Sequence, residues 1–272
     1  MRIVVLALLL AVAASLAFGA EAVELPSRDG PIRAQLLRPP GAGPFPAIVA
    51  LHGCAGIGTR SLPLRPIYRD WGTRWVEAGY AVVFPDSFGS RGAGPQCRAR
   101  ERRIRPAVER TRDAEAALAW LRAQPWVKSD RISLVGWSNG ASTALWTVRA
   151  GNGGPARDGD FRQAIAFYPG CRVPAQRGWS ARIPTLILIG EADDWTPAAA
   201  CHDMVKQARG RSALVDIVGY PGAYHSFDSP NLPVRVRTGL AYTGNGSGTA
   251  HIGTNPAARE DAIRRVMQWL AR

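Results

Sequence analysis

Residues 136–140 read Gly-Trp-Ser-Asn-Gly, which is the pattern Gly-x-Ser-x-Gly. An apolar run at 132–135 precedes the pattern, and a helix-like segment at 141–149 follows it. In a turn from strand to helix the central serine stands on a sharp bend, and larger residues at the glycine positions would collide with neighbouring backbone. A glycine-rich chain can carry such a turn by chance, but this context predicts that Ser138 is a nucleophile.

A serine hydroxyl is a weak nucleophile until a base takes its proton and an acid orients that base. In sheets of this type the order along the chain is serine, carboxylate, histidine. A buried strand expected at 184–190 is followed by Glu191, Asp193 and Asp194, in a loop position where active sites of open α/β sheets lie. We expect Asp193 to be the acid, ahead of Asp194 and then Glu191. These acids could instead cap a helix at 197–209, and Asp194 suits that role.

The chain has four histidines, and their order discriminates among them. His225 follows a strand-like run at 215–218 and precedes the last helix by one loop, as the base of such a triad does. His52 precedes the serine, and we expect it to bond to local backbone. His202 lies in the helix after the acid loop, and His251 lies in a glycine-rich loop. The order therefore selects His225 as the base.

Two backbone N–H groups are needed to hold the oxyanion that forms in acyl transfer. One is expected from Asn139, the residue after the nucleophile, and the other from the loop that follows the third strand. That strand is expected at 46–51, and the loop after it reads His-Gly-Cys-Ala-Gly at 52–56. Glycine lets backbone approach a substrate closely, and we choose Cys54 as the second donor.

Strand and helix signals alternate along the chain, which predicts an α/β fold with a mostly parallel sheet and helices on both faces. Strands are expected at 23–25, 31–37, 45–51, 80–85, 132–136, 164–168, 184–190 and 215–218, and helices at 68–78, 107–123, 141–150, 197–209 and 257–270. The first two strands flank Asp29 and Gly30 and are expected to pair as an antiparallel edge hairpin. The loops that carry the serine, the acid and the base then leave the sheet at one edge.

Five pieces of the sequence, taken in order, resemble the dienelactone hydrolase family of α/β-hydrolases. They are His-Gly-Cys-Ala-Gly at 52–56, Phe-Pro-Asp-Ser-Phe at 84–88, the serine motif at 136–140, Gly-Glu-Ala-Asp at 190–193 and His-Ser-Phe at 225–227. The resemblance implies the α/β-hydrolase fold and the hydrolysis of small esters or lactones. The spacing of Gly190, Asp193 and Pro197 matches the acid loop of the family, which supports Asp193 as the acid.

Two departures from the family bear on the chemistry. Its founding members use a cysteine nucleophile with the help of a glutamate, whereas this chain has Ser138 at the turn and Gly53 where the glutamate is expected. Both departures favour serine esterase chemistry over dienelactone hydrolysis. The family also uses arginines to hold a substrate carboxylate, and Arg91, in the loop after Asp86, is the candidate for that role. We expect neither a cofactor nor a metal.

The chain opens with Met-Arg, an uncharged apolar run at 3–17 and the tripeptide Ala-Glu-Ala at 20–22. This order is typical of a secretory signal peptide, with a single membrane-spanning helix as the alternative. We expect residues 1–22 to be removed, leaving a periplasmic or secreted protein with no stable membrane anchor. Residues 23–272 suit one α/β-hydrolase domain. Within it, residues 228–256 carry weak structural signals and could border the active-site mouth.

The four cysteines of an exported chain suggest two disulfides. In an α/β-hydrolase sheet, Cys54 and Cys97 follow neighbouring strands, and Cys171 and Cys201 follow another neighbouring pair. We therefore predict the disulfides Cys54–Cys97 and Cys171–Cys201, each bracing loops at the active site. A zinc site is the alternative, but no Cys-x-x-Cys spacing supports it.

The formal net charge is +13, and eight arginines lie between positions 91 and 112. No signature of a nucleic-acid-binding module accompanies this charge, so nucleic acid is not an expected partner. A solvated basic face is the favoured interpretation, with anionic polymers or acidic substrates as the alternative. Part of the cluster, next to Asp113, is expected to form structural ion pairs.

Together these features predict a secreted serine hydrolase that cleaves small carboxylic esters or lactones through an acyl-enzyme intermediate. A peptidase of the prolyl-oligopeptidase type would share the fold and the order of the triad, but this chain lacks the large N-terminal domain that such enzymes usually carry. The third alternative is a catalytically inactive hydrolase fold used for binding. The presence of all three triad residue types weighs against it.

Overall fold

The computed structural model describes residues 19–59, 61–151 and 158–272. Residues 1–18 of the predicted signal peptide, and with them most of that prediction, lie outside the described residues. The last two residues of the predicted leader, Glu21 and Ala22, begin strand β1 (Glu21–Leu25), where both are exposed.

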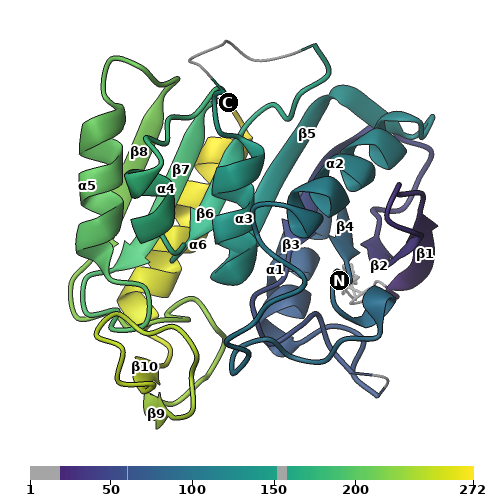
Figure 1. The fold of residues 1–272 in the computed structure, drawn as a ribbon. Helices are drawn as coiled ribbons and strands as arrows, with labels where there is room; N and C mark the ends of the chain where they lie inside the picture. The colour runs from purple at the N-terminus through teal and green to yellow at the C-terminus, as the bar shows by residue number, and fades with distance from the viewer. Residues whose placement is uncertain (1–18, 60, 152–157) are drawn as a thin grey trace, which may run out of the picture.

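The central sheet has eight strands in the order β1-β2-β4-β3-β5-β6-β7-β8 (Figure 1). After β1 these are β2 (Ile32–Leu37), β3 (Phe45–Leu51), β4 (Ala81–Pro85), β5 (Val127–Trp137), β6 (Ala164–Phe167), β7 (Thr185–Gly190) and β8 (Val215–Tyr220). β2 pairs antiparallel with β1 and with β4, and the other neighbours are parallel. Strands covered on both faces read as continuous apolar runs, and every residue of β4 and β7 is buried. The predicted mostly parallel sheet and its edge hairpin are confirmed.

Helices cover both faces of the sheet. They are α1 (Pro66–Glu77), α2 (Glu109–Arg122), α3 (Asn139–Thr147), α4 (Arg172–Gln176), α5 (Ala198–Ala208) and α6 (Pro256–Leu270), with a 3-10 turn at Gly89–Arg91. α1 and α6 lie on one face, and α2, α3 and α5 lie on the other (Figure 1). α6 begins where Asn255 accepts a hydrogen bond from the Ala258 N–H and Pro256 follows, which are strong start signals. The short helix α4 is absent from the sequence prediction.

An aromatic cluster anchors the strands that lead to the serine motif. The ring of Trp137, at the end of β5, lies 5.6 Å from that of Phe167 in β6 and 5.9 Å from that of Trp75 in α1. Trp71 of α1 lies 5.2 Å from Phe167. Buried aromatic side chains dominate the energetics of such a core, so the end of β5 is held rigidly.

Residues 229–254, which we name the mouth segment, contain regular structure that the sequence does not predict. Two short strands, β9 (Arg235–Arg237) and β10 (Ala250–Ile252), pair antiparallel. Ile252 forms a parallel bridge with His225, so the mouth segment lies beside the loop of the predicted base. It projects from the end of the molecule below the sheet in Figure 1.

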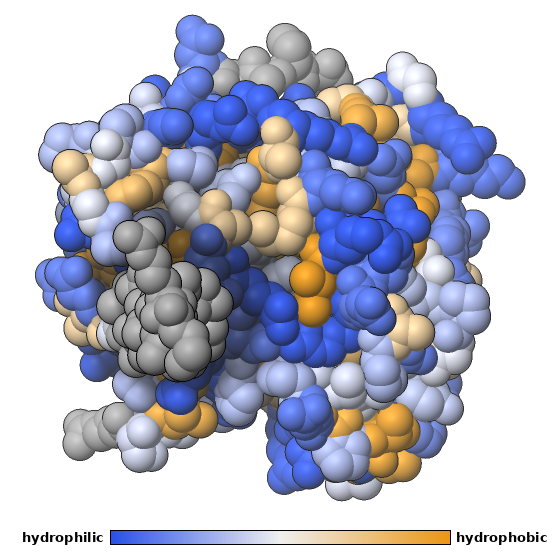
Figure 2. Space-filling model, turned by 180° about the vertical axis from the view of Figure 1, so that it is seen from behind, coloured by the Kyte–Doolittle hydropathy of each residue, from blue (hydrophilic) through white to orange (hydrophobic). Residues whose placement is uncertain are grey.

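The face seen in Figure 2, opposite to that of Figure 1, is mostly hydrophilic, and its hydrophobic residues lie in small separate groups. Within residues 19–59, 61–151 and 158–272, no helix has both the length and the apolar composition that a membrane crossing requires.

Candidate active site

The serine motif forms the tight turn that its glycines predict. Ser138 has φ 53° and ψ −113°, a strained conformation for a residue with a side chain. A Cβ atom on Gly136 would lie 2.3 Å from the Gly140 carbonyl oxygen, and one on Gly140 would lie 2.0 Å from the Leu51 carbonyl oxygen. Only glycine therefore fits on either side of the bend, and the bend leaves the Ser138 side chain partly exposed at the end of β5.

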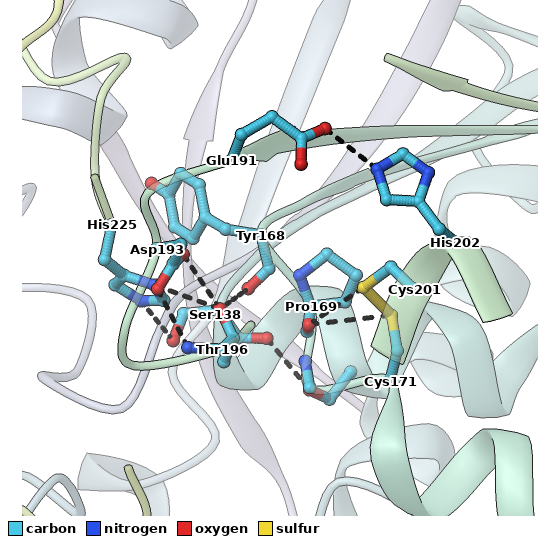
Figure 3. The surroundings of a disulfide bond; sticks show 12 residues. Ser138, Tyr168, Pro169, Cys171, Glu191, Asp193, Thr196, Cys201, His202 and His225 are labelled. Atoms are coloured by element: carbon cyan, nitrogen blue, oxygen red, sulfur yellow. Dashed lines mark hydrogen bonds and ion pairs between the residues drawn. A yellow bond between two sulfur atoms is a disulfide. The ribbon is translucent and has the colours of Figure 1, made fainter. Parts of the chain in front are cut away.

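Ser138, His225 and Asp193 come together at the carboxyl ends of the parallel strands. His225 Nε2 lies 3.0 Å from Ser138 Oγ, and His225 Nδ1 lies 2.8 Å from Asp193 Oδ2 (Figure 3). His225 is 2% exposed and Asp193 is 3% exposed. A carboxylate at Nδ1 favours the tautomer whose proton is on Nδ1, which leaves Nε2 free to accept the serine proton.

Backbone and hydroxyl donors fix the orientation of the acid. Asp193 Oδ1 accepts hydrogen bonds from the N–H groups of Trp195 at 2.9 Å and Thr196 at 2.8 Å. Thr196 Oγ1 lies 3.0 Å from Asp193 Oδ2, 3.2 Å from His225 Nδ1 and 3.1 Å from the Tyr168 carbonyl oxygen. Hydrogen bonds to both oxygens hold the carboxylate in one orientation.

Two aromatic rings enclose the imidazole of His225. The ring of Tyr168 lies 4.4 Å from it and that of Trp195 lies 4.6 Å from it. Sequence reasoning missed Tyr168, Trp195 and Thr196. Thr196 stands three residues after the acid, and this short spacing was the signal that could have found it.

The other candidate acids and histidines pair with each other away from the serine. Asp194 Oδ2 lies 2.8 Å from His251 Nδ1, and Asp194 Oδ1 accepts the His251 N–H at 2.8 Å. Asp194 therefore does not cap α5, whose N-cap position is Pro197 with no side-chain bond. Glu191 lies 2.8 Å from His202.

His52 makes the local backbone contact that we expect of it. Its Nδ1 lies 2.8 Å from the Gly53 carbonyl oxygen. Burial, and then the positive charge of Arg110, lower the pKa of His52 well below its usual value. A neutral imidazole held in this way has no contact with Ser138 among the described residues.

The two predicted oxyanion donors flank the serine. Asn139 is the first residue of α3, where backbone N–H groups have no partner within the helix. The Gly53 N–H is occupied because it donates to the Tyr68 hydroxyl at 2.8 Å. The Cys54 N–H donates to no group of the described residues, and Cys54 lines the same cleft as Ser138.

This cleft has a volume of about 410 Å³ and contains three arginines, Arg65, Arg235 and Arg237. Arg65 donates to the carbonyl oxygens of residues 55 and 56. Burial, followed by the positive charge of Arg235, lowers the pKa of Arg237, and its guanidinium lies 5.7 Å from the ring centroid of Trp195. None of the three forms an ion pair with a described carboxylate. The sequence did not point to them, because two lie in the mouth segment.

Arg91, the expected carboxylate-binding residue, does not line this cleft. Its guanidinium donates to both oxygens of Asp113, at 2.9 and 2.7 Å, and to the Ser87 carbonyl oxygen at 2.9 Å. Asp113 is fully buried, and a buried carboxylate requires a partner. The expectation for Arg91 is corrected accordingly: it forms one of the structural ion pairs of the arginine cluster.

Both predicted disulfides are present, Cys54–Cys97 and Cys171–Cys201. The first fastens the loop of the predicted oxyanion donor. The second lies beside the triad, because the Pro169 carbonyl oxygen lies 3.7 and 3.5 Å from its two sulfurs and Tyr168 is the preceding residue (Figure 3). Disulfide sulfurs carry no proton, so these distances are packing contacts.

The sheet order and the turn at Ser138 define an α/β-hydrolase fold. The model of the dienelactone hydrolase family matches residues 32–272, and the chain belongs to this family. It is similar to a putative carboxymethylenebutenolidase of Methylorubrum extorquens, with 25% identity over 78% of this chain and 73% of the relative. A probable 2-oxo-3-(5-oxofuran-2-ylidene)propanoate lactonase of Bradyrhizobium is 24% identical over 71% of this chain and 78% of its own length.

Solved structures agree with this fold. A putative dienelactone hydrolase of Klebsiella pneumoniae covers 94% of this chain and 99% of its own, with a TM-score of 0.68 and 17% identity. An esterase of Thermogutta terrifontis covers 93% and 94% respectively, with a TM-score of 0.65 and 18% identity. The family and fold that the sequence resemblance implied are confirmed, and the chain is a hydrolase of this family.

Proposed function

We propose that the protein is a serine hydrolase of carboxylic esters or lactones, with Ser138 as nucleophile, His225 as base and Asp193 as orienting acid. The observation that carries the proposal is the continuous contact from Ser138 Oγ through the imidazole to the Asp193 carboxylate, at 3.0 and 2.8 Å. The strained serine conformation and the unoccupied Cys54 N–H support the same assignment.

The reaction proceeds in two halves. Ser138 Oγ attacks the carbonyl carbon while His225 Nε2 takes its proton, and Asp193 stabilises the imidazolium that forms. The N–H groups of Cys54 and Asn139 donate to the oxyanion. Collapse of this intermediate breaks the bond to the leaving alcohol, which receives the proton from His225. Water, deprotonated by the same histidine, then hydrolyses the acyl-enzyme and releases the acid.

The cleft favours substrates with a negatively charged group near the scissile bond. Arg65, Arg235 and Arg237 line it without an acidic partner among the described residues, and hydrogen bonds between a guanidinium and an anion are roughly twice as strong as neutral ones. The name of the Bradyrhizobium relative specifies a propanoate as the substrate of that protein, which supports an acidic ester or lactone here. A peptidase or a purely binding role has no comparable support from the cleft.

We also propose that the protein is exported from the cytoplasm. Two disulfides are typical of proteins that leave the reducing cytoplasm. Removal of residues 1–22 would take two exposed residues from the end of β1 and leave the rest of the sheet intact. Intact-mass measurement of the protein recovered from a periplasmic extract tests the cleavage site directly.

Labelling with a fluorophosphonate, mapped by mass spectrometry, tests the nucleophile. We expect one adduct on Ser138 and hydrolysis of an aryl acetate by the wild type. Ser138→Ala should lose both, whereas Ser61→Ala, at an exposed serine, should keep both. A wild-type protein that turns over activated esters no faster than Ser138→Ala would overturn the proposed function.

A further inference from the structure

Arg110, in the first turn of α2, is a fully buried cation close to the candidate site. Arginine is rarely buried completely unless a carboxylate pairs with it. The nearest candidate, Asp113, gives its two oxygens to Arg91 instead. Burial lowers the pKa of Arg110 to about 10, so the guanidinium keeps its charge at neutral pH.

The guanidinium bonds to two acceptors, one on each segment that carries a predicted oxyanion donor. Nη1 donates to Asn139 Oδ1 at 2.5 Å, and Nη2 donates to the His52 carbonyl oxygen at 2.8 Å. Asn139 supplies one donor N–H itself. His52 lies two residues before Cys54, which supplies the other. A single side chain of α2 thus joins the loop after β3 to the first turn of α3.

The remaining surroundings of Arg110 offset part of the cost of its burial, because the negative charges of Asp113 and Asp86 favour its charged form. Its Cζ lies 5.1 Å from the ring centroid of Phe88, which packs edge-on against His52 at 4.7 Å. Its Nε finds no partner among the described residues. These charges and the ring would favour a lysine at this position as well. The two hydrogen bonds across the turn are therefore the specific contribution of an arginine here.

We propose that Arg110 is a positioning residue for the oxyanion hole, holding the Cys54 and Asn139 N–H groups at a fixed separation by bonding to both segments. The proposal rests on the proposed serine hydrolase function. Donors that are already aimed at the developing oxyanion need no rearrangement during reaction, which is the main source of their effect. The two donors stand on separate segments, so their spacing depends on a link between those segments. The buried positive charge also favours negative charge nearby.

Arg110→Met tests the proposal, because methionine fills similar space without donors or charge. The assay uses an aryl ester and protein with both disulfides formed. In Arg110→Met, kcat and the rate constant for acylation should fall about tenfold to a hundredfold below the wild type, since the loss of one oxyanion donor costs about a hundredfold or more. KM should change less than about threefold, because the ground-state ester does not need the oxyanion donors. Arg110→Lys keeps the positive charge but cannot bond to both segments as the guanidinium does. Its kcat should therefore lie between those of the wild type and Arg110→Met.

Arg182→Met is the matched control. Arg182 is also largely buried, pairs with Asp160 and donates to the Thr147 carbonyl oxygen at the far end of α3. This variant should lose thermal stability as Arg110→Met does, yet keep the wild-type kcat. The proposal is overturned if Arg110→Met keeps the wild-type acylation rate, or if both variants lose kcat equally at equal loss of stability.

The same measurements separate this proposal from the proposed function. An inactive wild type with no fluorophosphonate adduct on Ser138 would reject the serine hydrolase. An active, labelled wild type with an unaltered Arg110→Met would reject only the positioning role. Slower fluorophosphonate labelling of Arg110→Met is expected as well, because the phosphonyl oxygen occupies the oxyanion position.

Discussion

Asp228, three residues after His225, is a buried acid on which the aromatic core depends. Its Oδ2 accepts the indole N–H groups of Trp71 and Trp137, both at 2.8 Å, and its Oδ1 accepts the Tyr168 hydroxyl at 2.8 Å. Burial raises the pKa of Asp228, and the three donors act in the opposite direction. Trp137 precedes Ser138 and Tyr168 packs on His225, so this carboxylate ties together the supports of both residues.

Replacing Asp228 tests that dependence. Asp228→Leu leaves three buried donors without an acceptor, and each such group costs about 1–3 kcal/mol. We expect a loss of about 3 kcal/mol or more in the free energy of unfolding, measured by denaturant titration. Asp228→Asn keeps one oxygen for the two indoles and should lose clearly less. Equal stability of the Leu variant and the wild type would contradict the network.

Arg237 is the residue on which we expect charge selectivity to depend most, since it is half-buried beside Trp195 and faces the cleft. Arg237→Gln should raise KM for an ester that carries a carboxylate by about tenfold, because a hydrogen bond to a charged group contributes about 1.5–3 kcal/mol. The neutral ester of the same size should keep its kcat/KM. Arg209→Gln, beyond the end of α5, is the surface control. An equal loss for both esters would refute charge recognition.

Among the elements, the loop after β3 depends on the Cys54–Cys97 disulfide, which closes a loop of 43 residues. Cys171–Cys201 closes a loop of 30 residues, so chain entropy predicts a similar stabilisation of about 4 kcal/mol for each. Only the first disulfide holds a predicted oxyanion donor.

Removing each disulfide by a double alanine substitution separates stability from function. Both double variants should lose a comparable free energy of unfolding. Cys54→Ala with Cys97→Ala should also lose kcat, measured below the unfolding transition, whereas Cys171→Ala with Cys201→Ala should lose less. If the second pair of substitutions lowered kcat more than the first, the assignment of the oxyanion loop would need revision.

At the scale of the whole molecule, stability at high pH depends on buried phenols. Burial raises the pKa of Tyr68 to about 12, and Tyr68 accepts the Gly53 N–H. The unfolded chain releases this proton from about pH 10, whereas the folded chain keeps it until about pH 12. The stability that Tyr68 contributes in its neutral form is therefore present below pH 10 and lost as pH rises from about 10 to about 12.

Denaturant midpoints measured across that interval check the sign and size of the effect. The shift in pKa corresponds to about 3 kcal/mol of lost stability. Tyr68→Phe should show a smaller decrease over the same interval than the wild type. A parallel decrease in both proteins would assign the pH dependence to other groups.

The sequence was sufficient for features that depend on order along the chain and on strand ends. The turn at Ser138 and the acid loop each follow a strand with a buried apolar end, and the loop of His225 follows the half-buried edge strand β8. Parallel strands bring such loops to one edge of the sheet. The disulfide pairs followed from the same neighbour relations. The strong apolar signal of the strands is why these predictions needed no coordinates.

Other features depend on packing that no local pattern encodes. Arg91 is close to Asp86 in sequence, yet its guanidinium bonds to Asp113, a buried acid on another element. Arg235 and Arg237 lie on a strand of three residues. Such a strand is too short to show the alternation of apolar and polar residues that identifies a strand in a sequence. The role inferred for Arg110 depends on two acceptors that are 29 and 58 residues away.

The mouth segment leaves and rejoins the domain at nearly the same point, because the Asn255 N–H donates to the Phe227 carbonyl oxygen at 3.0 Å. Asp194 ties it to the acid loop through His251 and accepts the Gly244 N–H on its carbonyl oxygen. A loop closed at its base can lengthen, shorten or change composition at little cost in entropy. The mouth segment can therefore be replaced as one unit during evolution. Such a replacement would change which substrates are accepted while Ser138, Asp193 and His225 keep their positions.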